Sequence, residues 1–314
     1  MKKIAQKILV TGGAGFIGSH LVDALSAKGH RLVVVDNLST GFQRNINPKA
    51  KFYKTDLTHF ESVNRIMKKE KPEIVFHLAA QMNVRKSVEN PLFDAENNIL
   101  ASINLIRTSH ENKIKKFIFA STGGAIYGDT KNRPTPETEK EWPLSPYGIA
   151  KLSVDKFLFY YHRIHGLKFV SLRYANVYGP RQNPHGEAGV VAIFLKKMLK
   201  NQTPTINGDG KQTRDYVFVE DIVKANRLAL ENFEKSGIYN VGTGKETSVN
   251  KLFREINKYF QGKFRKSHGP AKIGEQKTSC LSFTKIKKDF GWTPQTDFQT
   301  GIRKTFEWFR DNLV

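Results

Sequence analysis

The stretch TGGAGFIGSH, residues 11–20, decides the fold. Its glycines Gly12, Gly15 and Gly18 are spaced three apart, and residues 13–18 also read G-x-G-x-x-G. An apolar segment precedes it, and a segment with helical spacing, residues 16–30, follows it. Glycines at these places permit a tight turn, close approach of the backbone to a pyrophosphate, and close packing of helix on strand. The free N–H groups at the start of such a helix favour phosphate. The sequence therefore predicts a strand–turn–helix unit that binds a dinucleotide.

Outward from this unit, short apolar segments alternate with segments of helical spacing. The predicted strands are 7–13, 31–37, 51–56, 73–80 and 115–122, and the helices between them include 57–71 and 91–112. Such alternation is typical of a parallel sheet covered on both faces, and right-handed crossovers make it doubly wound. We therefore expect an α/β fold with a Rossmann-type doubly wound parallel sheet.

The alternation of predicted strands and helices becomes irregular after residue 178, where Pro and Gly interrupt 179–189 and 203–212. Residues 1–178 are predicted to form the dinucleotide-binding Rossmann domain, to which 214–245 returns. Residues 179–213 and 246–314 are predicted to form a smaller mixed α/β domain that binds the substrate.

The chain of 314 residues carries 51 Lys+Arg against 29 Asp+Glu, a formal charge of +22. These charges are scattered, which favours solvated helix faces over a nucleic-acid surface. Cys280 is the sole cysteine, so an intrachain disulfide is impossible, and the absence of an apolar run of about 18 residues argues against a membrane span. We expect a cytoplasmic protein with no nucleic-acid or membrane partner. His162 and His165 lack further ligands nearby in sequence, so no metal site is predicted.

Two aspartates end predicted strands. Asp36 lies about 20 residues after the glycine turn, where a carboxylate binds the ribose hydroxyls of NAD and repels the 2′-phosphate of NADP. Asp56 and Leu57 follow the third strand and are candidates to hold the adenine. The alternatives are an Asp36 that caps a loop and an Asp56 that caps a helix. His77 is expected to satisfy a hydrogen bond at the end of its strand.

SPYGIAK, residues 145–151, places Tyr147 four residues before Lys151. Ser145 as N-cap and Pro146 in the first turn predict a helix over 145–165, on which Tyr147 and Lys151 share a face. A phenol has a pKa near 10, but a buried ammonium and the positive nicotinamide ring favour the phenolate. A downward shift of about three units corresponds to roughly 4 kcal/mol. Tyr147 is therefore a candidate general base, unless the helix is solvated and carries the pair by chance.

A third group must polarise the substrate oxygen. Thr122 and Ser121 end the strand 115–122, at the edge where open α/β sheets bind ligands. Either hydroxyl is a candidate.

Seven motifs together resemble the extended short-chain dehydrogenase/reductases: TGGAGFIGSH, DNLSTG, HLAAQ, FASTGGAIYG, SPYGIAK, LRYANVYGPRQ and GDGKQTRDYVFVEDI. The chain is most similar to the nucleotide-sugar epimerases, and among them to the UDP-glucose 4-epimerases. This resemblance implies an NAD-dependent enzyme of galactose metabolism that inverts C4 of a UDP-hexose through a transient 4-keto sugar. It also implies a homodimer that pairs through residues 91–110 and 145–165.

The resemblance assigns roles residue by residue. Tyr147, Lys151 and Thr122 match the catalytic residues, with Ser121 as second choice. The implied NAD contacts are Gly12, Gly15, Phe16, Ile17, Gly18, Asp36, Asn37, Ser39, Thr40, Gly41, Asp56, Leu57, Leu78, Ala79, Ala80, Gln81, Asn98, Tyr147, Lys151 and Tyr174. The implied contacts to the UDP-sugar are Thr122, Tyr147, Asn176, Val190, Thr205, Ile206, Asn207, Arg214, Lys272 and Ser279.

Departures from the family pattern bear on the substrate. Gly123 and Gly124 stand where related dehydratases carry Asp and Glu, and where decarboxylases usually carry Glu. Lys272 replaces a usual arginine. Ser279 replaces a bulky tyrosine and leaves room for a 2-N-acetyl group, so UDP-N-acetylglucosamine and UDP-N-acetylgalactosamine are expected substrates beside UDP-glucose and UDP-galactose. The alternatives are a UDP-uronate epimerase, a decarboxylase, a dehydratase, or a non-catalytic NAD-binding protein.

Overall fold

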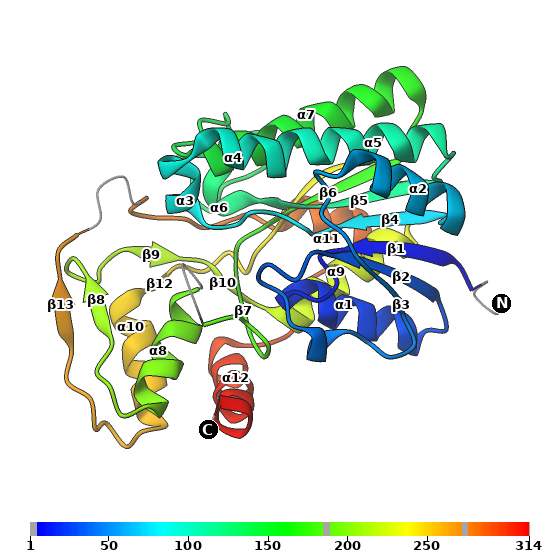
Figure 1. Cartoon of the computed structure of the whole chain (residues 1–314). Coiled ribbons are helices and arrows are strands. Elements are labelled where there is room, and N and C mark those ends of the chain that lie inside the picture. Colours follow the sequence, from blue (N-terminus) through cyan, green and yellow to red (C-terminus); the bar gives the residue numbers. More distant parts are fainter. Residues whose placement is uncertain (1–4, 185–188, 272–275, 314) are drawn as a thin grey trace.

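A sheet of seven parallel strands forms the centre of the larger part of the molecule, in the order β11-β6-β5-β4-β1-β2-β3 (Figure 1). The computed structural model describes residues 5–184, 189–271 and 276–313. The strands of this sheet are β1 Lys7–Thr11, β2 Arg31–Asp36, β3 Lys51–Lys54, β4 Ile74–His77, β5 Lys116–Thr122, β6 Phe169–Tyr174 and β11 Gly237–Val241. The predicted Rossmann-type sheet is confirmed, and its order reverses between β1 and β4, where such folds bind ligands.

Helices cover both faces of this sheet. α2 Phe60–Glu70, α5 Ala101–Glu111 and α7 Pro146–His165 lie on one face, and α1 Phe16–Ala27, α9 Val219–Glu231 and α11 Thr284–Phe290 lie on the other. Successive strand residues enter opposite cores: Ile8 and Val10 pack with α1, whereas Leu9 packs with α2 and α5. Burial on both faces explains why the strands read as continuous apolar runs.

The predicted helix over 91–112 has a more complex hydrogen-bond pattern. It consists of α4 Pro91–Ala95, a π-turn η2 Glu96–Leu100, and α5 in direct succession. A short helix that the sequence did not predict, α3 Val84–Glu89, precedes it. Asn83 and Asn90 cap α3 and α4 by accepting the N–H groups of Lys86 and Phe93. Six residues carry too weak a periodic signal for such a helix to be recognised.

The second part of the chain has its own core, with Phe194, Leu195, Phe253, Ile256 and Phe309 buried together. Three two-stranded sheets border it: β7 Asn176–Tyr178 with β10 Tyr216–Phe218, β9 Thr213–Arg214 with β12 Thr247–Ser248, and β8 Thr205–Asn207 with β13 Ser267–Gly269. Its helices are α8 Val190–Leu199, α10 Val249–Lys258 and α12 Phe298–Leu313. The short elements η1 Gln43–Asn45 and α6 Gly123–Ile126 complete the fold.

The chain returns to the main sheet after β10. α9 packs against α1, and β11 pairs with β6 at the sheet edge. The domain boundaries drawn from the sequence stay a prediction.

Candidate active site

The glycine turn after β1 packs tightly against the neighbouring backbone, so that side chains have no room there. Gly12 has φ +71°, and a Cβ there would lie 2.6 Å from the backbone nitrogen of Ala79. A Cβ on Gly18 would collide with the carbonyl of Gly12, because helix α1 lies directly against the turn. Gly15 is the N-cap of α1 and offers no side-chain acceptor to the first N–H groups. These features fit the pyrophosphate of a dinucleotide.

Asp36, the last residue of β2, is joined to this turn. Its Oδ2 accepts the N–H of Ala14 (3.0 Å), its Oδ1 accepts the N–H of Leu38 (2.8 Å), and burial raises its pKa. Each carboxylate oxygen has a second lone pair, so the two oxygens remain able to accept ribose hydroxyls. The glycine turn and Asp36 therefore fit NAD, the cofactor that the sequence predicts.

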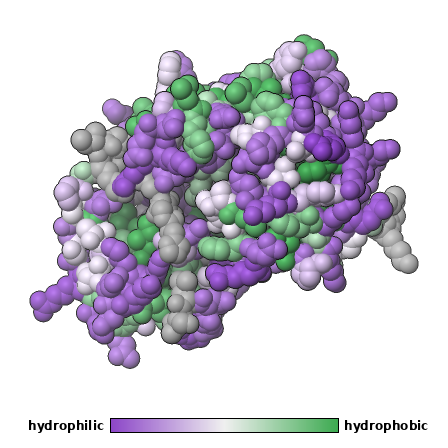
Figure 2. All heavy atoms as spheres, viewed as in Figure 1, coloured by the Kyte–Doolittle hydropathy of each residue, from purple (hydrophilic) through white to green (hydrophobic). Residues whose placement is uncertain are grey.

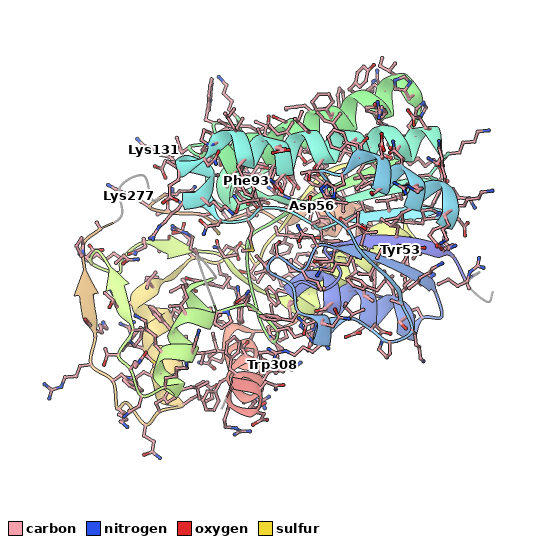
Figure 3. The ribbon with its side chains drawn as sticks, viewed as in Figure 1. Tyr53, Asp56, Phe93, Lys131, Lys277 and Trp308 are labelled. Carbon is pink, nitrogen blue, oxygen red and sulfur yellow. The ribbon has the colours of Figure 1, made fainter. Side chains whose placement is uncertain are left out.

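The loop after β2 leads from Asp36 to Asp56. Asn37 donates to Asp56 (2.6 Å) and accepts the N–H of Ser39 (2.9 Å). Asp56 also accepts the N–H and hydroxyl of Thr58; although burial opposes it, these bonds lower its pKa. Figure 3 shows Asp56 near the middle of the molecule. Asp56 thus caps the turn before α2, and its contact with adenine stays a prediction, as does that of Leu57.

The buried His77 at the end of β4 takes part in a chain of hydrogen bonds that positions the residues after this strand. Thr11 Oγ1 and His77 Nδ1 are 2.7 Å apart, His77 Nε2 and Ser102 Oγ are 2.8 Å apart, and Thr11 Oγ1 accepts the N–H of Ala79 (3.2 Å). Burial lowers the pKa of His77 to about 3, so the ring is neutral. The expectation that His77 serves hydrogen bonding at the strand end is confirmed.

Gln81 and Asn98 are paired. The N–H of Gln81 donates to Asn98 Oδ1 (2.9 Å), and Asn98 Nδ2 donates to the carbonyl of Gln81 (2.8 Å). Both side-chain amides also donate to Asp94 Oδ1, at 2.9 and 2.8 Å. Asp94 was missed by the sequence reasoning, because it stands in no recognised motif.

Helix α7 begins as predicted. Ser145 caps it by accepting the N–H of Gly148 (3.2 Å), and Pro146 occupies the first turn. Lys151 is buried, donates to the carbonyl of Ala120 (2.9 Å), and has its Nζ 5.9 Å from the centre of the Tyr147 ring. The pair therefore lies side by side at the carboxyl end of β5.

The electrostatics of this pair differ from the sequence expectation. Burial lowers the pKa of Lys151 to about 8, although Asp155 and Asp94 act in the opposite direction. Burial raises the pKa of Tyr147, and the charge of Asp94 raises it further. Apart from burial, the charge that raises the pKa of the phenol is thus that of Asp94. The lowered pKa predicted for Tyr147 stays a prediction for the site with the positive nicotinamide ring in place.

The two hydroxyl candidates on β5 face opposite ways. Ser121 is buried and donates to Asp155 (3.3 Å), which also accepts from Arg173 (2.9 Å). Thr122 points to the other face of the sheet, since neighbouring strand residues alternate. The choice of Thr122 over Ser121 as the catalytic hydroxyl stays a prediction.

Thr122 converges with two residues from distant parts of the chain. A Cβ placed on Gly124 would lie 3.6 Å from Asn176 Oδ1 and 3.9 Å from both Ser279 Oγ and Thr122 Oγ1. A Cβ on Gly123 would instead collide with the side chain of Leu281. The structure thus brings three predicted site residues around Gly124.

The remaining predicted contacts to the nucleotide come from the second part of the chain. Arg214 in β9 is half-buried and donates to the carbonyl of Thr213 (2.8 Å). Val190 begins α8, and Thr205, Ile206 and Asn207 form β8, with Ile206 buried in the second core. Lys272 lies outside the described residues. Their contacts with a substrate stay predictions.

A cavity of about 240 Å³ lies away from the catalytic pair. It is lined by Phe42, Arg44, Arg181, Gln182 and Trp308, the last on α12 at the bottom of Figure 3. Within residues 5–184, 189–271 and 276–313, no three His, Cys, Asp or Glu side chains are grouped to hold a metal ion. No helix in the same ranges combines the length and apolarity required to cross a bilayer.

A doubly wound sheet with a glycine turn, an acidic residue ending β2, and a Tyr–Lys pair at the carboxyl end of β5 defines a dinucleotide-dependent enzyme of the short-chain dehydrogenase/reductase class. The chain belongs to the NAD dependent epimerase/dehydratase family, whose pattern it matches over residues 8–242.

Relatives with curated names and solved structures agree with this membership. A protein of Methanocaldococcus jannaschii named "Putative UDP-glucose 4-epimerase" is 46% identical over 305 residues, which cover 97% of this chain and 99% of that protein. The crystal structure of a UDP-glucose 4-epimerase from Thermotoga maritima with UDP-glucose has a TM-score of 0.95 and 48% identity, covering 98% of this chain and 100% of the other. A UDP-glucose 4-epimerase from Thermus thermophilus in complex with NAD has a TM-score of 0.92 and 42% identity, covering 98% of this chain and 99% of the other.

Proposed function

We propose that the protein is an NAD-dependent epimerase that inverts C4 of a UDP-hexose and interconverts UDP-glucose and UDP-galactose. The observation that carries this proposal is the Tyr147–Lys151 pair, which Lys151 joins to the carboxyl end of β5 beside a glycine turn that fits a dinucleotide. The near full-length similarity to UDP-glucose 4-epimerases supports it.

The chemistry divides among three side chains. When bound, NAD supplies the acceptor and donor of the hydride at C4. Tyr147 takes the proton from the 4-hydroxyl and returns it after the 4-keto sugar has turned. Lys151 holds Tyr147 and the cofactor ribose by charge and hydrogen bonding. Thr122 donates a hydrogen bond to the reacting oxygen. Inversion results because the same base serves both directions while the sugar presents opposite faces.

The glycines after Thr122 support epimerisation over elimination of water. A dehydratase needs a further acid and base beside the reacting carbon. Position 123 has no room for one, because Leu281 occupies the space that a side chain would enter. At Gly124 the absence of a side chain leaves a gap bordered by Thr122, Asn176 and Ser279.

Ser279 supports a broader choice of sugar. Its hydroxyl lies 3.9 Å from the Cβ position of Gly124, so a small residue borders the site where strict epimerases carry a tyrosine. We therefore expect UDP-N-acetylglucosamine and UDP-N-acetylgalactosamine to be interconverted as well.

An apolar face on α7 and α4 supports the proposed homodimer. Leu92, Ile149, Phe159, Tyr160 and Ile164 are exposed there. Figure 2 shows apolar side chains along the upper edge of the molecule, where Figure 1 places these helices. Several exposed apolar side chains on neighbouring helices are typical of a subunit interface. The free, buried Cys280 is compatible with the proposed cytoplasmic location. A second core supports the proposed substrate domain, although α11, within 246–314, packs in the core of the main sheet.

The test is a panel of UDP-, dTDP- and GDP-sugars incubated with the purified protein and analysed for C4 inversion. We expect UDP-galactose to give UDP-glucose, and Tyr147→Phe to lower the rate by at least about a thousandfold while NAD stays bound. Tyr259→Phe, at the C-cap of α10 and outside the catalytic residues and the proposed interface, is the matched control and should retain full activity. Loss of water, loss of carbon dioxide, or turnover of UDP-glucuronate alone would identify one of the alternatives, and no Tyr147-dependent turnover would indicate a non-catalytic NAD-binding protein.

A further inference from the structure

Asp94 is a buried carboxylate for which the mechanism above has no role. It lies in α4 and is 1% exposed. Its Oδ1 accepts two hydrogen bonds, from Gln81 and Asn98, whereas its Oδ2 is buried without a hydrogen-bond partner. Buried polar atoms are rarely left unpaired, and such an exception calls for an explanation.

The oxygen that is paired holds two expected NAD contacts together. Gln81 follows β4, and Asn98 lies in the π-turn η2, so the two come from different elements. Asp94 and Asn98 are four residues apart, on one face of the helical run that contains the π-turn. Turns of this kind occur frequently at functional sites. Removal of the Asp94 acceptor would leave both amides without their shared partner.

The charge of Asp94 acts across the contact between α4 and α7. It adds to burial in raising the pKa of Tyr147, and it opposes burial in the case of Lys151, whose pKa is nevertheless lowered to about 8. Burial raises the pKa of Asp94 itself, and the Lys151 charge opposes that rise. Because Oδ2 has no donor, no hydrogen bond offsets the charge on that oxygen.

Other charged groups border α4 but are placed differently. Arg85 and Lys86 lie on α3 and are exposed, as is Glu96 in η2. Asp155, one turn beyond Lys151 on α7, is engaged by the guanidinium of Arg173. Among charged groups, Lys151 is the one that shifts the pKa of Asp94.

We propose that Asp94 is a positioning residue of the catalytic centre, which fixes Gln81 and Asn98 through one oxygen and acts by its charge on Tyr147 and Lys151. This inference rests on the proposed function and deepens it. The buried negative charge retains the proton on Lys151. It also keeps Tyr147 a neutral phenol until the positive nicotinamide ring is present, so the base forms only in the loaded site.

The first experiment needs no turnover. Lysine labelled with ¹³C is titrated by NMR in the substrate-free protein, with Lys151→Met used to assign the Lys151 signal. In the unaltered protein Lys151 should titrate at about pH 8, and in Asp94→Asn, which keeps an acceptor oxygen but loses the charge, it should titrate at lower pH. Glu96→Gln, which removes an exposed charge two residues away, should leave the titration unchanged. Equal midpoints in all three proteins would overturn the proposal.

A reciprocal measurement guards against a variant that fails to fold. The carboxyl carbon of Asp94 is followed in Lys151→Met, where loss of the ammonium should raise its titration midpoint. An unchanged midpoint contradicts the proposed coupling, whatever becomes of Asp94→Asn.

Measurements of turnover then separate the effect of the Asp94 charge from the effect of its hydrogen bonds. In Asp94→Asn both limbs of the pH–rate profile should move to lower pH, because Tyr147 and Lys151 both lose their protons more readily. In Asp94→Ala the affinity for NAD should fall about tenfold as well, because Gln81 and Asn98 lose their acceptor. A purely structural role would lower the melting temperature and leave both limbs in place. Failure of the proposed function would remove turnover but not the NMR titrations, so the two failures are distinguishable.

Discussion

Replacement of Lys151 by Met should stabilise the protein while it abolishes catalysis. Lys151 is 3% exposed, and burial lowers its pKa from 10.5 to about 8. At about 1.4 kcal/mol for each tenfold change, this difference corresponds to about 3.4 kcal/mol by which folding opposes the charged amine. Met has a similar length without a charge. The hydrogen bond to Ala120 would be lost, which offsets about 1 to 2 kcal/mol, so the expected net gain at neutral pH is about 1 to 2 kcal/mol.

The pH dependence provides the sharper test. The folded-state pKa of Lys151 lies below its unfolded value, so between pH 8 and 10.5 the unfolded chain binds more protons than the folded one. The titration of Lys151 therefore raises the free energy of unfolding as the pH rises across this window. Below pH 8 it makes no contribution to the pH dependence. The free energy of unfolding of the unaltered protein, measured relative to Lys151→Met, should increase by about 3 kcal/mol from about pH 7.5 to 10.5.

Denaturant unfolding of the two proteins at several pH values, in the absence of NAD, measures this difference. Comparison with the variant cancels the titration of the other groups. Lys156→Met, on the same helix but exposed, is the matched control, since it removes the same side chain without a buried charge. A difference that stays constant over the window would show that the Lys151 ammonium is not buried as described, and the electrostatic reasoning would fall with it.

The remaining predictions concern the end of β5 and the cofactor site. Thr122→Val should lower kcat about 10²-fold, as steady-state rates will show. Ser121→Ala should leave kcat near normal and lower the free energy of unfolding by about 1 kcal/mol, measured from denaturant midpoints, because the Ser121 hydroxyl donates to the buried carboxylate of Asp155. Gly123→Ala should destabilise by about 1 to 3 kcal/mol through collision with a core leucine, and Gly124→Ala should instead raise the KM for the UDP-sugar with little change in melting temperature. Asp36→Asn should weaken NAD binding about tenfold in a direct titration, and an unchanged affinity would contradict its assignment to the ribose.

Local signals in the sequence were sufficient for the catalytic helix and the cofactor turn. Ser145, Pro146 and the spacing of Tyr147 and Lys151 determine α7 through caps and periodicity within one segment. The choice between Ser121 and Thr122 required the strand register, because one residue along a strand reverses the face to which a side chain points. The sequence leaves both as candidates, and the bond from Ser121 to Asp155 favours Thr122, whose role stays a prediction.

Features that depend on distant contacts were beyond the sequence. Asp94 joins Gln81 after β4 to Asn98 in a π-turn, and hydrophobic periodicity gives no signal for that turn or for the contact between these elements. In the sequence, Gly123 indicates the absence of a catalytic acid; the structure adds a packing reason, because Leu281 fills the space beside it. Substitution patterns read as function can thus have a steric cause as well.

The positions of Arg214 and Ser279, two expected contacts to the UDP-sugar, depend on another buried carboxylate, that of Asp215. It accepts N–H groups from Thr243, Gly244 and Leu281, and burial raises its pKa. Asp215 follows Arg214 and Leu281 lies two residues after Ser279, so these bonds tie both expected substrate contacts to the loop after β11. The backbone around Arg214 and Ser279 is therefore fixed, while no side chain fills the space at Gly124. Inversion requires this combination, because the base must stay in place while the 4-keto sugar turns to present its other face.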